Sequence, residues 1–168
     1  MFEVSYLINT IIKPTTAELG MPDATNLLLD TFAQESQLGK YLVQIGGGPA
    51  LGLGQIEPAT NSLVLTWAMD NKPDIYDTLK TIRGRTQSVP GMRVCDDINL
   101  VALQYNHCYN CAIARCLYYS IQEPLPDPND VVALGQYWKS YYNRGGKGTV
   151  DEFVQSYNTL VAPFLPCT

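Results

Sequence analysis

The chain has 168 residues, of which 46% are hydrophobic and 16% are charged, and its formal net charge at pH 7 is −5. This composition excludes a disordered protein, and we expect residues 1–168 to fold as one domain without metal ions or disulfides as cross-links. The 11 basic residues are scattered along the chain, so nucleic acid is not expected as a partner.

An apolar run extends from Val4 to Ile12 and is followed by Lys13 and Pro14. The acidic Glu3 precedes the run, and no small-residue cleavage pattern follows it. We therefore expect a core helix that ends at the Lys13-Pro14 break, and no secretory signal. No segment predicts a membrane span. If the substrate lies outside the cytoplasm, the protein must be carried there by another route.

A second helix is expected to begin at Pro22 and Asp23. One face of this helix carries side chains at the i, i+3, i+4, i+7 spacing; they are Ala24, Leu27, Leu28, Thr31 and Phe32. Glu35 takes the next position of this stripe, at the C-terminal end, where the pattern favours an apolar residue. Because a buried carboxylate is costly, Glu35 is a candidate functional residue. Considered alone, it is better explained as a solvent-facing acid or as the partner of Lys40.

The segment from Gly46 to Gly54 reads GGGPALGLG, and its glycines predict a loop or a short hairpin. The other segments have helical periodicity. The first of these helices is expected from Pro58 to about Asp70, with Leu63, Val64 and Trp67 on its apolar side, and the next from Pro73 to Arg83. A helical region between Asp96 and Ile121 is expected to be broken near Asn106 to Asn110. The last two helices are expected after a cap at Asn129 or Asp130, with Tyr137, Trp138, Tyr141 and Tyr142, and from the capping box of Thr149 and Glu152 to Leu160. The predicted fold class is mainly α.

The five cysteines, an odd number, are Cys95, Cys108, Cys111, Cys116 and Cys167. At least one of them is therefore free or paired between chains. The spacing of Cys108 and Cys111, with His107 and Cys116 nearby, would allow a zinc site. Structural zinc sites usually use two separated ligand pairs, however, and these residues lie in one short stretch. We interpret the cysteines as buried free thiols and expect no metal or other cofactor.

Several common catalytic patterns are absent from the sequence. It contains no GxSxG elbow, no Walker loop and no HExxH helix. With His107 as the one histidine, a Ser/His/Asp triad would have a single possible base and no evident nucleophile loop. The chemistry must therefore be sought in the carboxylates.

Four segments in order resemble the catalytic domain of lytic transglycosylases and goose-type lysozymes. Glu35-Ser36 resembles the ES motif of that family, and residues 52–60, GLGQIEPAT, resemble its GLMQIMPAT. Residues 112–119 are similar in placement to the helix that lines the cleft floor, and residues 142–145, YNRG, resemble AYNAG. A YWKxYYN segment followed by GKGT and a final helix is similar to phage virion-associated members. The motif-bearing core spans 22–145, and the C-terminal helix spans 149–160.

This resemblance implies a lysozyme-like helical domain with the Gly-rich loop at the cleft. It implies that Glu35 is the single acid/base in cleaving the MurNAc-GlcNAc β-1,4 bond of peptidoglycan, with 1,6-anhydroMurNAc as product. Further residues are then expected to bind substrate: Ser36, Gly52, Leu53, Gln55, Tyr142 and Asn143. Glycan strands, and other virion proteins, become the expected partners. The expected location is a phage virion that acts at the host cell wall.

Physical reasoning about the residue types supports these roles. An acid for glycoside cleavage must stay protonated near neutral pH, and partial burial raises a carboxyl pKa in that direction. Glycines at 52 and 54 would allow close approach of a sugar, and Gln55 offers both a donor and an acceptor. Tyr142 is expected to hydrogen-bond Glu35, and Asn143 to fix the chain or touch a sugar. Trp67, Trp138 and Tyr141 would stack on sugars or, as the simpler explanation, pack in the core.

Two departures from the family pattern leave alternatives open. Glu57 replaces an apolar residue and is either an inert surface acid or a second carboxylate that activates water in a hydrolytic muramidase. Arg144 replaces a small residue, which weakens the match at Tyr142. A third alternative is a catalytically silent virion component that keeps the fold as a building block or as a sugar-binding module.

Overall fold

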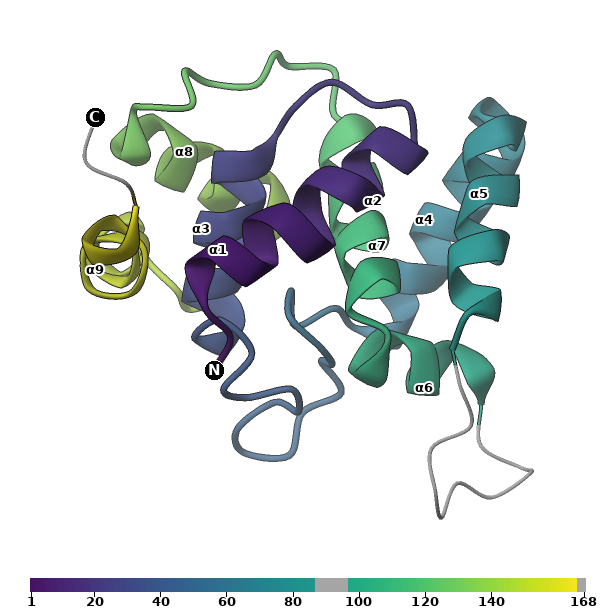
Figure 1. Ribbon diagram of the computed structural model, residues 1–168, viewed down its shortest axis with the longest axis horizontal. Coiled ribbons are helices and arrows are strands. Elements are labelled where there is room, and N and C mark those ends of the chain that lie inside the picture. Colours follow the sequence, from purple (N-terminus) through teal and green to yellow (C-terminus); the bar gives the residue numbers. More distant parts are fainter. Residues whose placement is uncertain (87–96, 166–168) are drawn as a thin grey trace.

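The computed structural model describes residues 1–86 and 97–165, and these ranges are mainly helical (Figure 1). The elements are α1 (Val4–Tyr6), the π-helical segment η1 (Leu7–Ile12), α2 (Lys13–Glu18), α3 (Thr25–Ser36), α4 (Pro58–Asn71), α5 (Pro73–Gly84), α6 (Ile98–Tyr105), α7 (His107–Tyr119), α8 (Val131–Tyr137), the π-helical segment η2 (Trp138–Tyr142), α9 (Val150–Leu160) and the 3-10 turn η3 (Ala162–Phe164). The predicted mainly α fold class is confirmed. No strand forms in the described ranges, where the Gly-rich region contributes only two isolated bridges, Val43 with Leu51 and Leu51 with Ile56.

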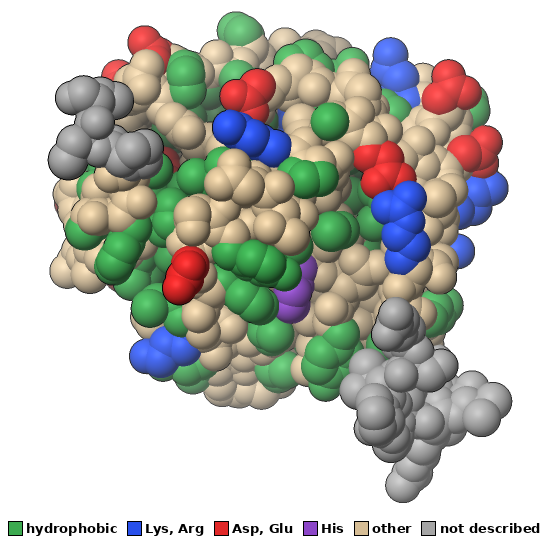
Figure 2. Space-filling model, viewed as in Figure 1, with side chains coloured by type: hydrophobic (Ala, Val, Ile, Leu, Met, Phe, Trp, Pro, Cys, Tyr) green, Lys and Arg blue, Asp and Glu red, His purple; other side chains and the backbone are tan. Residues whose placement is uncertain are grey.

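Helix α7 lies at the centre of the fold (Figure 1). Helices α4 and α5 cover one side of it, α3, α8 and α9 lie on the other, and the N-terminal helix crosses in front. Buried apolar side chains from α1 to α9 form one cluster. None of the described helices has the length and apolar character that a membrane span requires. On the face drawn in Figure 2, acidic and basic side chains are dispersed among the others without a basic stripe.

The N-terminal helix is longer than the sequence predicted. α1, η1 and α2 are continuous from Val4 to Glu18, so the expected end at Lys13-Pro14 is wrong. Pro14 is the second residue of α2 and directly follows the π-helical segment. The preceding π-helical turns, in which Lys13 N–H donates to Ile8 O, change the hydrogen-bond register before the proline. The predicted core role of this helix is confirmed, because Leu7, Ile11 and Ile12 are buried.

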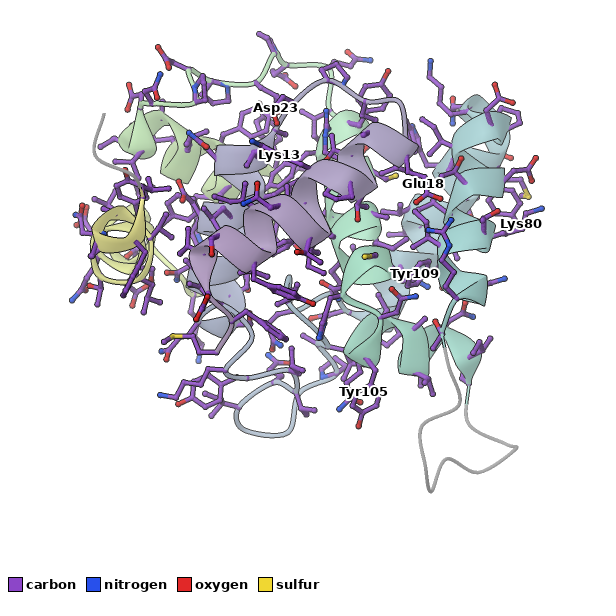
Figure 3. All side chains as sticks on the ribbon, in the orientation of Figure 1. Lys13, Glu18, Asp23, Lys80, Tyr105 and Tyr109 are labelled. Atoms are coloured by element: carbon purple, nitrogen blue, oxygen red, sulfur yellow. The ribbon has the colours of Figure 1, made fainter. Side chains whose placement is uncertain are left out.

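Two polar contacts lie at the end of α2 and at the start of α3, and their residues Glu18 and Asp23 are labelled in Figure 3. At the end of α2, Glu18 accepts two hydrogen bonds from Arg85, at 2.6 and 2.8 Å, and so ties α2 to the residue after α5. Asp23 lies beside Lys13 in Figure 3, and its Oδ1 accepts from both the backbone N–H and the hydroxyl of Thr25 at the start of α3. Together with the neighbouring Lys13 charge, these bonds lower the pKa of Asp23.

The buried face of α3 is the predicted one, whereas the buried face of α4 differs from the prediction. The predicted face of α3 is buried from Ala24 to Phe32, and Glu35 lies in the last turn. In α4 the buried residues are Asn61, Val64 and Ala68. Leu63 is 72% exposed, so its predicted place on the apolar side is wrong. The face is centred on the i, i+3, i+7 positions from Asn61, and Leu63 points away from that line.

Side-chain caps set several of the later helix boundaries. The predicted break between α6 and α7 is confirmed at Asn106, whose Oδ1 accepts from Tyr109 N–H at 2.9 Å. Of the two predicted caps of α8, Asp130 is the one used, accepting from Ala133 N–H at 2.9 Å. The predicted capping box of Thr149 and Glu152 is present at the start of α9. The polar residue types at these positions therefore predicted the helix starts correctly.

Asn110 of α7 holds the loop between α3 and α4 against the core. Its side chain is completely buried, and its Oδ1 accepts from Gly54 N–H at 2.7 Å. Its Nδ2 donates to Leu51 O and to Leu103 O, both at 2.9 Å. One amide therefore satisfies two loop groups and one carbonyl at the end of α6. Unsatisfied buried groups of this kind are expensive, so the loop is fixed to the α6–α7 junction.

A matched pair of glycine substitutions tests this attachment. Gly52 and Gly47 have similar positive φ values, +75° and +83°, but a Cβ at Gly52 would collide with Leu103 O and the Asn110 amide, whereas nothing lies within 4 Å at Gly47. We expect Gly47→Ala to lower the free energy of unfolding by about 1–2 kcal/mol, from backbone strain alone. Gly52→Ala should cost at least ~2 kcal/mol more, because the Asn110 hydrogen bonds must open. Urea denaturation measures both, and equal losses would contradict the attachment.

Candidate active site

A cleft of about 920 Å³ lies among the end of α3, the loop before α4 and the segment that follows η2. Its lining includes Glu35, Gln55, Tyr142 and Asn143, which the sequence had predicted as site residues, together with Glu57. Residues from three separated parts of the chain are therefore brought to one cavity. The carboxyl at the end of the α3 stripe faces this cavity and is partly buried.

Glu35 is held by a hydrogen bond that sequence reasoning missed. The indole Nε1 of Trp138 donates to Glu35 Oε1 at 2.9 Å. Burial raises the pKa of Glu35 from an ordinary 4.5 to about 7, and the donors of Trp138 and the nearby Asn143 side chain offset part of that rise. The carboxyl is thus protonated below about pH 7 and ionised above it, so it can act as a general acid or a general base near neutral pH.

Trp138 is itself fixed from several sides. Its side chain is completely buried, which supports the core-packing interpretation. Its ring packs on Phe153 of α9, with centroids 5.2 Å apart, and backbone at Gly148 passes so close that a Cβ there would lie 2.7 Å from the ring. A buried indole N–H needs an acceptor, and Glu35 supplies it. That requirement is the signal by which the sequence could have paired the two residues.

Tyr142 does not bind Glu35 as predicted. Its hydroxyl donates to Gly54 O at 2.7 Å and so joins the end of η2 to the loop before α4. Burial, reinforced by the Glu35 charge, raises the pKa of Tyr142 well above its usual 10, so the hydroxyl stays a donor. Its ring packs on Tyr118, with centroids 5.2 Å apart. The prediction failed because the Gly54 carbonyl, fixed by the loop, takes the one proton the hydroxyl can donate.

Gln55 lines the cleft, but its donor end is used inside the loop. Its Nε2 donates to Tyr41 O and to Gly52 O, both at 3.0 Å. The backbone of Gln55 is left-handed, with φ of 46°. Among the described residues no hydrogen bond reaches its Oε1, which leaves an acceptor for a ligand. The prediction that Gln55 offers both a donor and an acceptor is therefore reduced to the acceptor.

Three predicted substrate-binding residues are buried away from the cleft. Ser36 is completely buried, and its hydroxyl donates to Phe32 O at 3.1 Å and accepts from Gly39 N–H at 2.9 Å, which ends α3. Leu53 is completely buried in the core. Gly52 is also buried, and it is close to Leu103 O and Asn110. These residues shape the loop, and a direct sugar contact does not fit their position.

Lys139 orders the segment that follows η2. Its Nζ donates to Gly146 O at 2.6 Å and lies 3.3 Å from Asn143 Oδ1. Asn143 N–H donates to Trp138 O at 2.9 Å, which closes the last π-helical turn. A lysine in the last turn of a helix often serves the free carbonyls there. Lys139 was not predicted as a site residue, and Asn143 fixes the chain as expected.

The other aromatic and charged candidates separate into core and cleft residues. Trp67 and Tyr141 pack against the core and do not line the cleft, as the simpler interpretation had it. Tyr41, which the sequence did not single out, lines the cleft instead. Lys40 lies over the Tyr41 ring, 5.0 Å from its centroid. Within the described residues it forms no ion pair with Glu35.

The cysteine-rich start of α7 forms no evident metal site. Among the described residues, no group of three or more His, Cys, Asp or Glu side chains is placed to hold a metal ion. The predicted buried free thiols are confirmed for Cys111 and Cys116, while Cys108 is half-buried. Burial raises the pKa of Cys116 to about 12. The predictions for Cys95 and Cys167 lie outside the described residues.

Asp30 is a second buried acid on α3 that the sequence pattern did not reveal. It is 1% exposed, its Oδ1 has no hydrogen-bond partner among the described residues, and it does not line the cleft. Burial raises the pKa of Asp30 from 3.8 to about 7. Asp30 is buried where no ligand can reach it, so its raised pKa affects the stability of the fold. Glu35, in contrast, has both the proton affinity and the access that catalysis would require.

Asp30→Asn should reverse a pH-dependent loss of stability. Between pH values near 3.8 and 7 the folded chain keeps a proton on Asp30 that the unfolded chain has lost, so the free energy of unfolding falls as pH rises through this window. The neutral amide removes that fall. Relative to wild type, the variant should gain on the order of 3 kcal/mol between pH 4 and pH 8. The measurement is urea denaturation at both pH values, with Asp70→Asn as a surface control. The prediction would be contradicted by a difference in unfolding free energy between Asp30→Asn and wild type that is the same at pH 4 and pH 8.

No protein-family model, curated protein or solved structure matches this chain. The comparisons therefore assign no family. The case for a function rests on the cleft, on the environment of Glu35 and on the motif order in the sequence.

Proposed function

We propose that this chain is a peptidoglycan-cleaving lytic transglycosylase with Glu35 as its acid and base. One observation carries the proposal: a partly buried carboxyl faces an open cleft, is held by Trp138 Nε1 at 2.9 Å, and has a pKa of about 7. A carboxyl with these properties is what protonation of a glycosidic oxygen requires at neutral pH.

In the proposed reaction, protonated Glu35 donates to the glycosidic oxygen as the bond between that oxygen and C1 of the muramic acid breaks. The C6 hydroxyl of the same sugar forms the new bond to C1 and gives its proton to the carboxylate that Glu35 has become. The product is a 1,6-anhydro sugar, water is not consumed, and Glu35 ends protonated. One carboxyl therefore serves both steps.

The surroundings of Glu35 suit this cycle. Trp138 donates to Oε1, which stabilises the ionised form that accepts the C6 proton. Burial opposes this by favouring the neutral form that begins the reaction. In the same cleft, Gln55 presents an acceptor oxygen that suits a sugar hydroxyl or an N-acetyl N–H. The proposal includes a lysozyme-like arrangement of the helices and, from the sequence resemblance, a role in a phage virion acting at the host wall.

Glu57 favours a second candidate function, a hydrolytic muramidase. It is exposed and lines the same cleft as Glu35. A second carboxylate at a suitable distance would activate water, and the product would then carry a reducing end. A catalytically silent sugar-binding component of a virion is the remaining alternative. The products and the effect of Glu35 distinguish the three.

Glu35→Gln should abolish cleavage while leaving the fold intact, because the amide is of equal size but cannot transfer a proton. Purified protein is incubated with sacculi, and the soluble products are analysed by mass spectrometry. We expect anhydromuropeptides from wild type and at least a ~100-fold lower rate from the variant. Asp30→Asn, which also removes a buried acid of α3, is the matched control and should keep its activity.

Each other result identifies an alternative. Products with reducing ends that also depend on Glu57 would replace the transglycosylase by a muramidase. Binding to sacculi without turnover by wild type would leave the silent component. Equal rates for wild type and Glu35→Gln would reject Glu35 as the acid.

Trp138→Phe should move the alkaline limb of the pH–rate profile upward. Removing the indole donor takes away a bond that lowers the pKa of Glu35, so the carboxyl should stay protonated to a higher pH, by about one pH unit. The measurement is kcat/KM on sacculi from pH 5 to 9, with Trp67→Phe as the control and circular dichroism as a check on folding. An unchanged or acid-shifted limb in a folded variant would refute this positioning role.

A further inference from the structure

We propose that Arg144 and Lys147 form a carboxylate-binding rim on the cleft, which selects glycan strands that carry peptide stems. The inference rests on the proposed function, since it names the part of the same substrate that this rim would bind. Both residues line the cavity that Glu35 faces, and both are exposed.

The rim places positive charge at the cleft of an acidic protein. The chain has a net charge of −5, yet Arg144 and Lys147 line the cleft with only two acids, Glu35 and Glu57. Glu35 is neutral below about pH 7 because of its raised pKa. The charge at the cleft is therefore positive overall, although the negative charge of the rest of the molecule would repel an anionic polymer.

In the part of the chain that the structure describes, most of the donor groups of the two cations have no protein partner. Among the described residues, Arg144 and Lys147 form no ion pair. Arg144 donates from Nε to Ser140 O at 3.4 Å, and no hydrogen bond is found for its two terminal nitrogens or for Lys147 Nζ. A guanidinium with both terminal nitrogens unoccupied is suited to a carboxylate, which it can bind through two parallel bonds.

The segment that carries the cations is fixed in place. Lys139 Nζ binds Gly146 O at 2.6 Å and Asn143 Oδ1 at 3.3 Å. Gly146 N–H donates to Asn143 O at 3.1 Å. Added side-chain atoms would collide with Asn143 at Gly146 and with Trp138 at Gly148. The backbone between Asn143 and Gly148 is thus packed against the residues that hold Glu35, which fixes the points from which both cationic side chains extend.

The chemistry of the substrate supplies the matching anions. In peptidoglycan the peptide stem is attached to the muramic acid, the sugar whose C1 reacts in the proposed function, and the stem carries free carboxylates. A bare glycan strand carries only the lactyl carboxylate of each muramic acid, which lies close to the sugar ring. A cationic rim beside the acid would therefore strengthen binding of peptide-bearing sugars more than binding of the bare strand.

Binding of a muramyl peptide and its amide tests the rim without any need for turnover. The probes are N-acetylmuramyl-L-alanyl-D-glutamate and the same molecule with both carboxylates amidated, titrated calorimetrically at low salt. We expect wild type to bind the free acid about three- to tenfold more tightly than the diamide, and less so at high salt. The double variant Arg144→Gln/Lys147→Gln should bind both equally. Lys72→Gln/Lys80→Gln removes as much charge away from the cleft and should keep the preference.

The outcomes separate this inference from the proposed function. Equal binding of acid and diamide by wild type, or a preference that survives in Arg144→Gln/Lys147→Gln, would overturn the rim even if sacculi are cleaved through Glu35. A rim-dependent preference in a protein that does not cleave sacculi would support the rim and reject the catalytic proposal.

Discussion

The hydrogen bond from Trp138 to Glu35 joins residues 103 positions apart, and the candidate site depends on it. Burial by itself favours the neutral carboxyl, and a donor aimed at one oxygen favours the charged one. The balance leaves the pKa of Glu35 at about 7. A carboxyl without the indole would hold its proton too tightly to be an efficient base, and an exposed one would lose it too early to be an acid. The geometry therefore suits both halves of the proton transfer that the proposed function requires.

Much of the remaining structure maintains that one contact. Phe153 of α9 packs on the Trp138 ring, and α9 is started by the capping box of Thr149 and Glu152. The hydroxyl of Ser156 donates to Gln34 Oε1 at 2.7 Å, which ties α9 to α3 one residue before Glu35. The C-terminal helix lies outside the recognisable motifs, yet it supports the residue that orients the acid. A truncation there would therefore affect the cleft as well as the fold.

Most of the fold could be predicted from local signals, and the failures have long-range causes. Periodicity and capping residues placed α4, α5 and α9 to within about one residue, whereas the predicted start of α3 at Pro22 and Asp23 came two to three residues before the observed start at Thr25. The predicted end of the first helix at Pro14 was wrong because a π-helical register before the proline kept the helix continuous. The prediction for Leu63 failed because periodicity alone does not determine which residues form the centre of the buried face of α4. Asn61 sets that centre through its bond to Tyr109 of α7, at 2.9 Å. Such contacts are absent from a local reading.

The position of Glu35 in a cleft was predictable, and the contacts of the residues around it were less so. Glu35 stood out because it broke an apolar stripe, but Ser36 and Gly52 matched motif letters while serving only the loop. Asn110 was overlooked because it lies among apolar residues of α7. Trp138 was predicted only to stack on a sugar or to pack in the core, and its hydrogen bond to the acid was missed. A polar group on a fully buried face must nevertheless find a partner, and when its own helix cannot supply one, the partner comes from a loop or a neighbouring helix. Asn110 finds the loop, at Gly54, and Trp138 finds the acid. Searching a sequence for such polar residues on buried helix faces would point to the anchors of a site as well as to its reactive group.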